Sequence, residues 1–210
     1  MKATLAVIAK APQPGRSKTR LSPPLSAGQA AELAEAALCD TLAAVGATAV
    51  ARRVLVLDGE LGQWPIADFE LLKQRGDGLE ERLANAFIDI GGATLIIGMD
   101  TPQVQPAILE RALERLSSAP AVLAPALDGG YWAIGLSRPD PGALLGVPMS
   151  TPGTLRAQRD RLRARGLPAA ELETLQDVDT YADALAVARA APTTRFAAAL
   201  ATMSPHGAAA

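Results

Sequence analysis

MKATLAVIAKAPQPGRSKTRLSP, residues 1–23, joins a short apolar run to a loop that is rich in proline and basic residues. The apolar residues 3–9 predict a buried strand, which ends before Pro12. Three closely spaced basic residues follow: Arg16, Lys18 and Arg20. Ligands of α/β sheets bind beyond the carboxyl ends of the strands, and Lys and Arg side chains suit phosphate. We therefore expect this loop to hold the phosphates of a nucleotide.

Apolar runs alternate with helical patterns along the rest of the chain. Further strands are predicted at 53–58, 69–72, 94–99, 121–124, 131–136 and 172–178. Helices are predicted to begin at a Ser26–Gln29 capping box, after Gly78, at Thr101-Pro102, at Ser150-Thr151 and at Asp179 or Thr180. This alternation predicts a single α/β domain of the Rossmann-like type, with a mainly parallel sheet and helices on both faces. The strands at 121–124 and 131–136 fit a hairpin. Residues 1–190 are expected to form this domain, and 191–210 an Ala-rich C-terminal helix and tail.

Composition excludes several classes of function. The chain has 210 residues, 49% of them hydrophobic, and a net charge of −2, so a broad cationic face for nucleic acid is not expected. No run approaches the roughly 18 apolar residues of a membrane span, and no signal peptide is visible, so we expect a cytoplasmic protein that binds no membrane. With one cysteine, Cys39, and one histidine, His206, neither a His/Cys metal cluster nor Ser-His-Asp or Cys-His catalysis is expected.

The basic loop does not match the P-loop of nucleoside triphosphatases. That motif, G-x-x-x-x-G-K-[ST], needs glycines where this chain has Pro12 and Ser17. Pro12 and Pro14 also lack the N–H groups with which a P-loop backbone surrounds phosphate. Two interpretations remain: side chains bind the phosphates while proline stiffens the loop, or the loop is a solvated basic connection.

Several aspartates follow predicted strands. Asp100 comes after an apolar strand, where it could ligate magnesium or cap the next helix. Asp177 or Asp179 could supply a second carboxylate, since Mg²⁺ often takes one or two from the protein. Asp179 could equally mark a helix start, with Thr180 as the N-cap and Asp183 at N3 in a second capping box. Asp128 opens the turn Asp128-Gly129-Gly130-Tyr131-Trp132, which would line an acceptor pocket or simply form a hairpin turn with core aromatics.

Five segments together resemble the radical-SAM/selenodomain-associated transferases, a glycosyltransferase-like bacterial family. The residues that match its motifs are Lys10-Ala11-Pro12 through Gly15 to Lys18-Thr19-Arg20-Leu21, Gly76-Asp77-Gly78-Leu79 with Arg82, Gly98-Met99-Asp100-Thr101-Pro102, Pro125 to Trp132, and Asp177-Val178-Asp179-Thr180. The resemblance covers residues 2 to about 188. It implies the nucleotide-diphospho-sugar transferase fold, also called GT-A, which 2-phospho-L-lactate guanylyltransferases share. Two segments depart from the family: Met149-Ser150-Thr151 stands where W-S-T is usual, and Tyr181-Ala182 where Pro-Glu is usual.

The resemblance also implies roles for particular residues. Asp100 and Asp179 would bind Mg²⁺ or Mn²⁺, and Lys18 and Arg20 would stabilise the charge of the phosphates during catalysis. Separately from the resemblance, we expect Asp128, at the mouth of its turn, to contact the acceptor or act as a base. The remaining nucleotide-binding positions implied are Lys10, Gly15, Thr19, Gly78 and Arg82.

The expected function is a magnesium-dependent transferase that takes an activated nucleotide. In one form a nucleotide-sugar donates its sugar to a small acceptor. In another, a nucleotidyltransferase related to the guanylyltransferases joins a nucleoside triphosphate to a phosphorylated or hydroxylated acceptor and releases pyrophosphate. A third alternative is a nucleotide-binding module without catalysis. The sequence leaves the nucleobase and the oligomeric state open.

Overall fold

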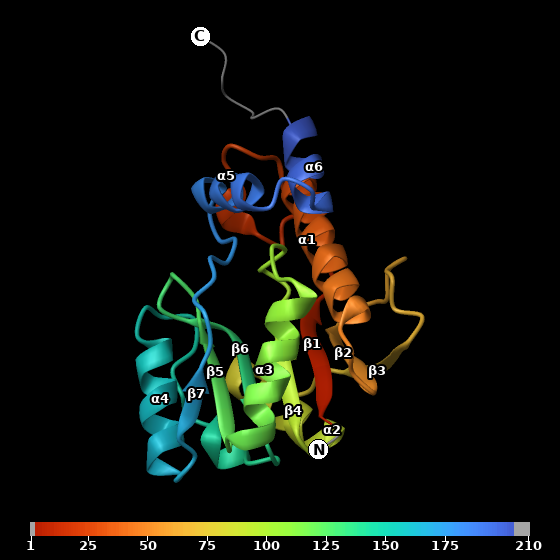
Figure 1. Ribbon diagram of the computed structural model, residues 1–210. Coiled ribbons are helices and arrows are strands. Elements are labelled where there is room, and N and C mark those ends of the chain that lie inside the picture. The colour runs from red at the N-terminus through yellow and green to blue at the C-terminus, as the bar shows by residue number, and fades with distance from the viewer. Residues whose placement is uncertain (1–2, 204–210) are drawn as a thin grey trace.

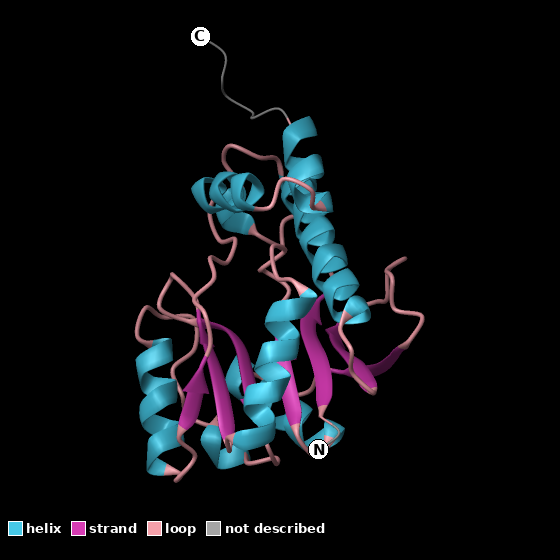
Figure 2. Cartoon of the chain, in the orientation of Figure 1, coloured by secondary structure: helices cyan, strands magenta, loops and turns pink. Residues whose placement is uncertain are grey.

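A computed structural model describes residues 3–203 of the chain (Figures 1 and 2). Seven strands form one sheet in the order β3-β2-β1-β4-β6-β5-β7. Their bounds are β1 Thr4–Lys10, β2 Arg52–Asp58, β3 Phe69–Lys73, β4 Thr94–Ile97, β5 Ala121–Pro125, β6 Tyr131–Leu136 and β7 Ala169–Glu171. All run parallel except β6, which is antiparallel to β4 and to β5. The predicted α/β class, mainly parallel sheet and β5–β6 hairpin are therefore confirmed.

Helices cover both faces of the sheet. α1 (Ala27–Ala47) and α3 (Pro106–Ser118) contribute to the hydrophobic cluster on one face, and α2 (Leu79–Ile90) and α4 (Thr154–Ala164) to that on the other. The central strand β1 contributes side chains to both hydrophobic clusters, because successive side chains of a strand point to opposite faces. Leu5 and Val7 pack toward α1 and α3, while Ala6 packs toward α2. No helix within residues 3–203 has the length and apolar character that crossing a membrane requires.

A third hydrophobic cluster lies beyond the carboxyl ends of the strands. There α5 (Tyr181–Ala190) and α6 (Arg195–Thr202) pack against the N-terminal half of α1 (Figure 1). The cluster buries Phe196 of α6, and also Leu21 and Leu25 of the basic loop. The base of that loop is thus fixed by packing. Within the Ala-rich segment 191–210, α6 is the helix, while residues 204–210, with His206, lie outside the described residues.

Three predicted elements are wrong. α4 begins at Thr154 with Gly153 as its N-cap and not at Ser150-Thr151, because residues 151–154 form a turn in which the N–H of Thr154 donates to the Thr151 carbonyl. α3 begins at Pro106 with Gln105 as its N-cap, because residues 101–104 form a turn in which the N–H of Val104 donates to the Thr101 carbonyl. Asp100 therefore does not cap this helix. The strand predicted at 172–178 is absent: β7 ends at Glu171, and only Leu175 makes a later bridge to the sheet. The capping boxes Ser26–Gln29 and Thr180–Asp183 are both present, so Thr180 and not Asp179 caps α5.

The strand order reverses at β1, whose chain continues to β2 on one side while β4 lies on the other. Open α/β sheets bind ligands at such a switch point, beyond the carboxyl ends of the strands. The basic loop follows β1, and Gly98 to Asp100 follow β4. The topology alone therefore places the loop and Asp100 side by side.

The N-terminus of α6 is held by a side chain from another helix. Both carboxylate oxygens of Asp40, on α1, accept N–H groups, from Arg195 at 3.0 Å and from Phe196 at 2.8 Å. We expect Asp40→Ala to lower the free energy of unfolding by about 1–3 kcal/mol, because two helix N–H groups lose their acceptor. Urea unfolding measures this change. Glu32→Ala, at an exposed position on α1, is the control, and an equal loss there would contradict the capping role.

Candidate functional site

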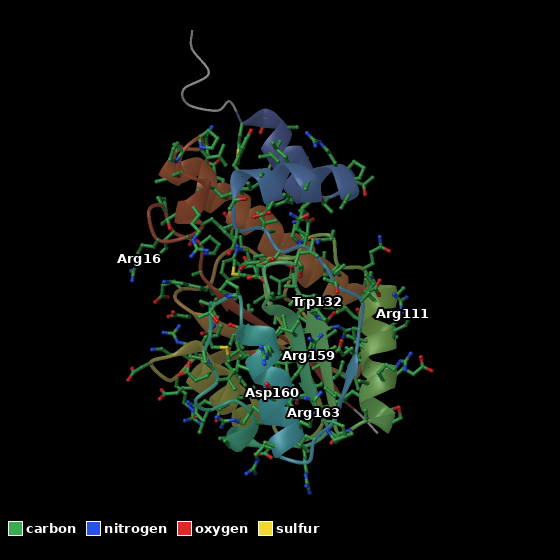
Figure 3. The ribbon with its side chains drawn as sticks, turned by 90° about the vertical axis from the view of Figure 1, so that its left-hand side faces the viewer. Arg16, Arg111, Trp132, Arg159, Asp160 and Arg163 are labelled. Atoms are coloured by element: carbon green, nitrogen blue, oxygen red, sulfur yellow. The ribbon has the colours of Figure 1, made fainter. Side chains whose placement is uncertain are left out.

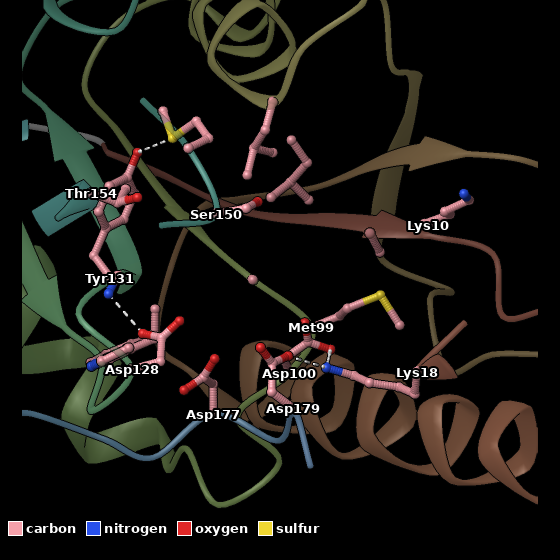
Figure 4. Close-up of a pocket in the computed structure, with 18 of the residues that line it drawn as sticks. Lys10, Lys18, Met99, Asp100, Asp128, Tyr131, Ser150, Thr154, Asp177 and Asp179 are labelled. Carbon is pink, nitrogen blue, oxygen red and sulfur yellow. Dashed lines mark hydrogen bonds and ion pairs between the residues drawn. The ribbon is translucent and has the colours of Figure 1, made fainter. Parts of the chain in front are cut away.

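A cavity of about 850 Å³ lies over the switch point (Figure 4). Its walls come from the basic loop after β1, the loop after β4, the start of α2, the β5–β6 turn, residues 149–154 at the start of α4, and the segment that leads into α5. Segments more than 150 residues apart in sequence thus share one cavity. This is the volume of a site for a small-molecule ligand such as a nucleotide.

Most of the residues that the sequence singled out line this cavity. They are Lys10, Lys18, Thr19, Arg20, Arg82, Asp100, Asp128 and Asp179. Gly15 and Gly78 do not line it. Gly15 has a φ of +72° and shapes the loop, whereas Gly78 is the N-cap of α2. Sequence reasoning missed Gln74 and Thr154, which also line the cavity. No sequence pattern marked either of them.

Several backbone groups of the basic loop are hydrogen-bonded within the loop itself. The Gln13 carbonyl accepts the N–H groups of Arg16 and Ser17, and the Gln13 N–H donates to Ser17 Oγ at 2.9 Å. These amides do not surround an empty anion-binding hollow as P-loop amides do. Arg16 projects outward from the loop (Figure 3). The geometry favours binding through side chains.

Lys18 is the most tightly held side chain of the site. Its ammonium group lies 2.8 Å from Asp100 Oδ1 and 3.5 Å from Asp179 Oδ1, and it donates to the Val178 carbonyl. Only 10% of the side chain is exposed. Burial lowers the pKa of Lys18, but the attraction and hydrogen bond of Asp100, with Asp179 and Asp177, outweigh burial and raise that pKa overall. Lys18 therefore remains charged between the two aspartates.

The other cations are less buried. Arg20 pairs with Asp179 Oδ2 at 3.2 Å, and 74% of its side chain is exposed. Arg82 pairs with Asp58 at 2.7 Å and also donates to Gln74. Gln74 in turn donates to the carbonyls of Ala9 and Val56, which fixes it at the ends of β1 and β2. Arg20 is thus free to reorient toward a ligand, whereas Arg82 is anchored.

Three carboxylates form a cluster at the acidic side of the cavity. One oxygen each from Asp128, Asp177 and Asp179 lies within 4.8 Å of the others. Burial and the repulsion of Asp128 and Asp179 raise the pKa of Asp177 to about 6. Mutual repulsion of this kind falls when a cation binds, and carboxylate oxygens are the ligands that Mg²⁺ and Mn²⁺ prefer. These residues could therefore hold such an ion. Asp100, the predicted first ligand, lies next to Asp179, where the Val178 N–H donates to its carbonyl, but its carboxylate pairs with Lys18 and is not one of the three clustered carboxylates.

The β5–β6 turn holds Asp128 in place. Asp128 Oδ1 accepts the N–H of Gly130 at 2.7 Å. Gly129 has a φ of +89°, and a Cβ there would lie 2.2 Å from the Pro152 carbonyl oxygen, so this position requires glycine and brings the 149–154 segment close. Tyr131 and Trp132 point to opposite faces of the sheet, because side chains alternate along β6. The Tyr131 hydroxyl donates to Gln158, and the buried indole of Trp132 donates to the Glu173 carbonyl.

Comparisons with known proteins place this geometry among related folds. A model of the DUF2064 family, described as uncharacterized protein conserved in bacteria, matches residues 41–151, which include Asp100 and Asp128. No curated protein matches the chain. A protein from Desulfovibrio desulfuricans G20, provisionally described as a nucleotide-diphospho-sugar transferase, superposes with a TM-score of 0.85 at 23% identity, over 95% of this chain and 94% of that chain.

Two solved structures with bound ligands are more distant. CMP:2-keto-3-deoxy-manno-octonic acid synthetase, solved with CTP, gives a TM-score of 0.53 at 16% identity, covering 90% of this chain and 98% of that chain. Rv0371C from Mycobacterium tuberculosis H37Rv, solved with manganese, gives 0.52 at 20% identity, covering 89% and 97%. At these identities the likeness establishes the nucleotide-diphospho-sugar transferase-like fold, which is shared with nucleotidyltransferases.

The raised pKa of Asp177 makes a prediction for the metal-free protein. In the unfolded chain this carboxyl titrates near 3.8, so the folded state binds its proton more tightly. The resulting stability is complete below the unfolded pKa and is lost as pH rises through about 6. Asp177→Asn should therefore raise Tm at pH 7.5, in the presence of a chelator, by about 2–4 °C, which corresponds to about 1 kcal/mol in a chain of this size. The gain should vanish near pH 4.

Thermal unfolding between pH 4 and 8 measures this difference. Asp68→Asn, at an exposed position, is the control and should leave Tm nearly unchanged throughout. A gain that is the same at every pH would rule out ionisation of Asp177 as its cause.

Proposed function

We propose that this chain, which belongs to the DUF2064 family, is a divalent-metal-dependent transferase that takes an activated nucleotide and resembles the radical-SAM/selenodomain-associated transferases. The observation that carries the proposal is the layout of the cavity. At the switch point of the sheet, the side-chain cations of the basic loop lie beside a carboxylate cluster, with Lys18 3.5 Å and Arg20 3.2 Å from Asp179. Phosphates bound by the loop and a metal ion bound by the carboxylates would meet between them.

The cations divide the task of binding phosphate. Arg20 is exposed and offers a planar fork that suits two phosphate oxygens. Lys18 supplies a buried positive charge close to the carboxylates. Lys10, Thr19 and Arg82 complete the wall toward the start of α2. Both side-chain cations would stabilise the charge that grows on the leaving diphosphate or pyrophosphate, so positioning and charge neutralisation, without a covalent intermediate, account for catalysis.

Asp179, Asp177 and Asp128 are the residues that would hold the metal. Asp179 is common to this cluster and to the pair expected from the sequence, whose other member, Asp100, is occupied by Lys18. When bound, Mg²⁺ or Mn²⁺ would neutralise phosphate charge and polarise the bond to the leaving group. Asp128 lies at the edge of the cluster, where a carboxylate could also contact the acceptor.

Two donors fit this layout. We favour a nucleotide-sugar, because the protein with the TM-score of 0.85 is provisionally described as a nucleotide-diphospho-sugar transferase. A nucleoside triphosphate is the alternative, favoured by the distant similarity to the synthetase solved with CTP. Sugar transfer releases a nucleoside diphosphate, whereas nucleotidyl transfer releases pyrophosphate. Assays for these two products separate the alternatives, and neither product in any donor screen would leave a non-catalytic nucleotide-binding module.

The first prediction of this function concerns thermal stability. The nucleotide that the site accepts should raise Tm by about 5–10 °C with Mg²⁺, because a ligand at about 100 times its Kd adds about 2.7 kcal/mol. The shift should be clearly smaller with a chelator, since metal and phosphates bind cooperatively. A thermal-shift screen of nucleoside triphosphates, diphosphates and nucleotide-sugars tests this. An intact shift in Lys18→Ala and Arg20→Ala would contradict the assigned phosphate contacts.

A second prediction separates the metal ligands. Without nucleotide, Asp179→Asn and Asp177→Asn should each weaken Mn²⁺ binding about tenfold or more, because each removes a charged oxygen donor. Asp100→Asn should weaken it less, because Lys18 already pairs with that carboxylate. Titration of free Mn²⁺ by electron paramagnetic resonance measures all three affinities. The opposite order, with Asp100 more important than Asp177, would assign the metal to the Asp100–Asp179 pair.

A further inference from the structure

The Lys18 ammonium group lies where a cation shared by Asp100 and Asp179 would lie. Figure 4 shows it beside both carboxylates, 2.8 Å from Asp100 Oδ1 and 3.5 Å from Asp179 Oδ1. The Val178 carbonyl oxygen is a third acceptor. Carboxylate and carbonyl oxygens are also the ligands that suit Mg²⁺ and Mn²⁺. The lysine therefore occupies oxygen atoms that a metal ion could use.

The donors of Lys18 are all engaged in this arrangement. An ammonium group carries three N–H donors, and the three oxygens around Lys18 match that number. To contact phosphate, as the proposed function requires, the lysine has to give up at least one of these oxygens. Lysine carries its charge on a flexible four-carbon stem, which allows such a movement.

The two carboxylates stay together without Lys18. The N–H of Val178, the residue before Asp179, donates to the Asp100 carbonyl at 3.0 Å, and Val178 is buried in the hydrophobic cluster of α1, α5 and α6. The side chains of Asp100 and Asp179 are 41% and 37% exposed, whereas that of Lys18 is 10% exposed. The carboxylates thus form a fixed pair that is open to the cavity, and the lysine is the part that can move.

We propose that Lys18 is an exchangeable counterion of Asp100. Without ligand, its charge competes with a metal ion for this carboxylate. The phosphates of the nucleotide draw the ammonium group away and leave Asp100 free to act as a further metal ligand. The inference rests on the proposed function and specifies how its nucleotide and metal are coupled. A positive charge held between two carboxylates repels a divalent ion there, and its transfer to phosphate removes that repulsion.

Arg20 provides a comparison, because it also pairs with Asp179. Its guanidinium group lies 3.2 Å from Asp179 Oδ2, but 74% of its side chain is exposed. Among the described residues, its ion pair is with Asp179 and not with Asp100. Water and salt screen an exposed charge strongly. Loss of Arg20 should therefore change metal affinity less than loss of Lys18, and independently of Asp100.

Titration of Mn²⁺ without nucleotide tests the competition. Lys18→Met should raise the affinity for Mn²⁺ about tenfold or more, because the competing charge is gone. Asp100→Asn should remove this gain, since the freed carboxylate is its source. Arg20→Met should raise the affinity less, and by the same factor with and without Asp100→Asn. Electron paramagnetic resonance of free Mn²⁺ measures these affinities.

Two results of this titration would overturn the competition. One is an affinity in Lys18→Met no higher than in the wild type, which includes the case that neither binds Mn²⁺. The other is a gain that survives Asp100→Asn. If Lys18→Met does not fold, Lys18→Gln takes its place, because the amide keeps two N–H donors and loses the charge.

A second titration tests release by phosphate. Asp100→Asn should weaken Mn²⁺ binding little in the free protein, but about tenfold with a saturating nucleoside diphosphate, chosen among ADP, CDP, GDP and UDP by the largest rise in Tm. Binding of Mn²⁺ to free nucleotide is the same for both proteins and cancels in the comparison. An equal effect of Asp100→Asn in both states would overturn the release.

The two titrations also separate this inference from the proposed function. If no nucleoside diphosphate, triphosphate or nucleotide-sugar stabilises the protein, the proposed function fails, and release by phosphate fails with it. The competition between Lys18 and the metal ion then still stands or falls on the titration without nucleotide. A nucleotide that binds while Lys18→Met gains no affinity for Mn²⁺ would overturn the competition alone.

Discussion

The ammonium group of Lys18 joins the two halves of the site. It contacts Asp100, which follows β4, the Val178 carbonyl, which lies 160 residues further along the chain, and Asp179, the residue after that. Without this charge, Asp100 and Asp179 would face one another with only solvent to screen their repulsion. Because Lys18 is largely buried, its attraction for both carboxylates is stronger than that of a surface ion pair.

One hydrophobic cluster holds in place both the segment that carries Lys18 and the segment that carries Asp179. Leu21, just after Lys18, and Val178, just before Asp179, are buried in one hydrophobic cluster with Phe196 of α6. α5 and α6 are therefore more than a covering at the end of the chain. By fixing the bases of the two segments, they set the distance between the basic loop and the carboxylates, and this distance decides whether phosphate and metal can meet.

The cavity concentrates features that oppose stability. Among the described residues, Lys18 and Ser150 are the non-glycine residues with positive φ, and both line it. Asp177 carries a raised pKa because other carboxylates crowd it. Strain and like charge of this kind are retained where a ligand relieves them, and a cation on the carboxylates would do so. The rest of the fold, with apolar side chains alternating cleanly between two covered faces, compensates for these costs.

Local sequence determined the elements whose signals are local. The run at 3–9, the two capping boxes and the 121–136 hairpin were predictable because side-chain alternation, capping hydrogen bonds and turn glycines act within a few residues. Sequence patterns gave wrong predictions where the same residues fit two local structures. Pro102 and Pro106 can each open a helix, and the turn at Thr101 selects the second. The run at 172–178 has apolar residues suited to a strand, but the sheet pairs with residues 169–171 and leaves the run as a connection.

Most of the residues that the sequence singled out line the cavity, but their partners were not predictable. The motifs placed Lys18, Asp100, Asp128 and Asp179 at one sheet edge, because parallel strands end on the same side. Only the tertiary structure decided that Lys18 pairs with Asp100 and that Asp177 joins Asp128 and Asp179. Such pairings depend on differences of a few ångströms between loops whose positions are set by packing elsewhere, in the α1–α5–α6 cluster and at Gly129. No local pattern records those distances.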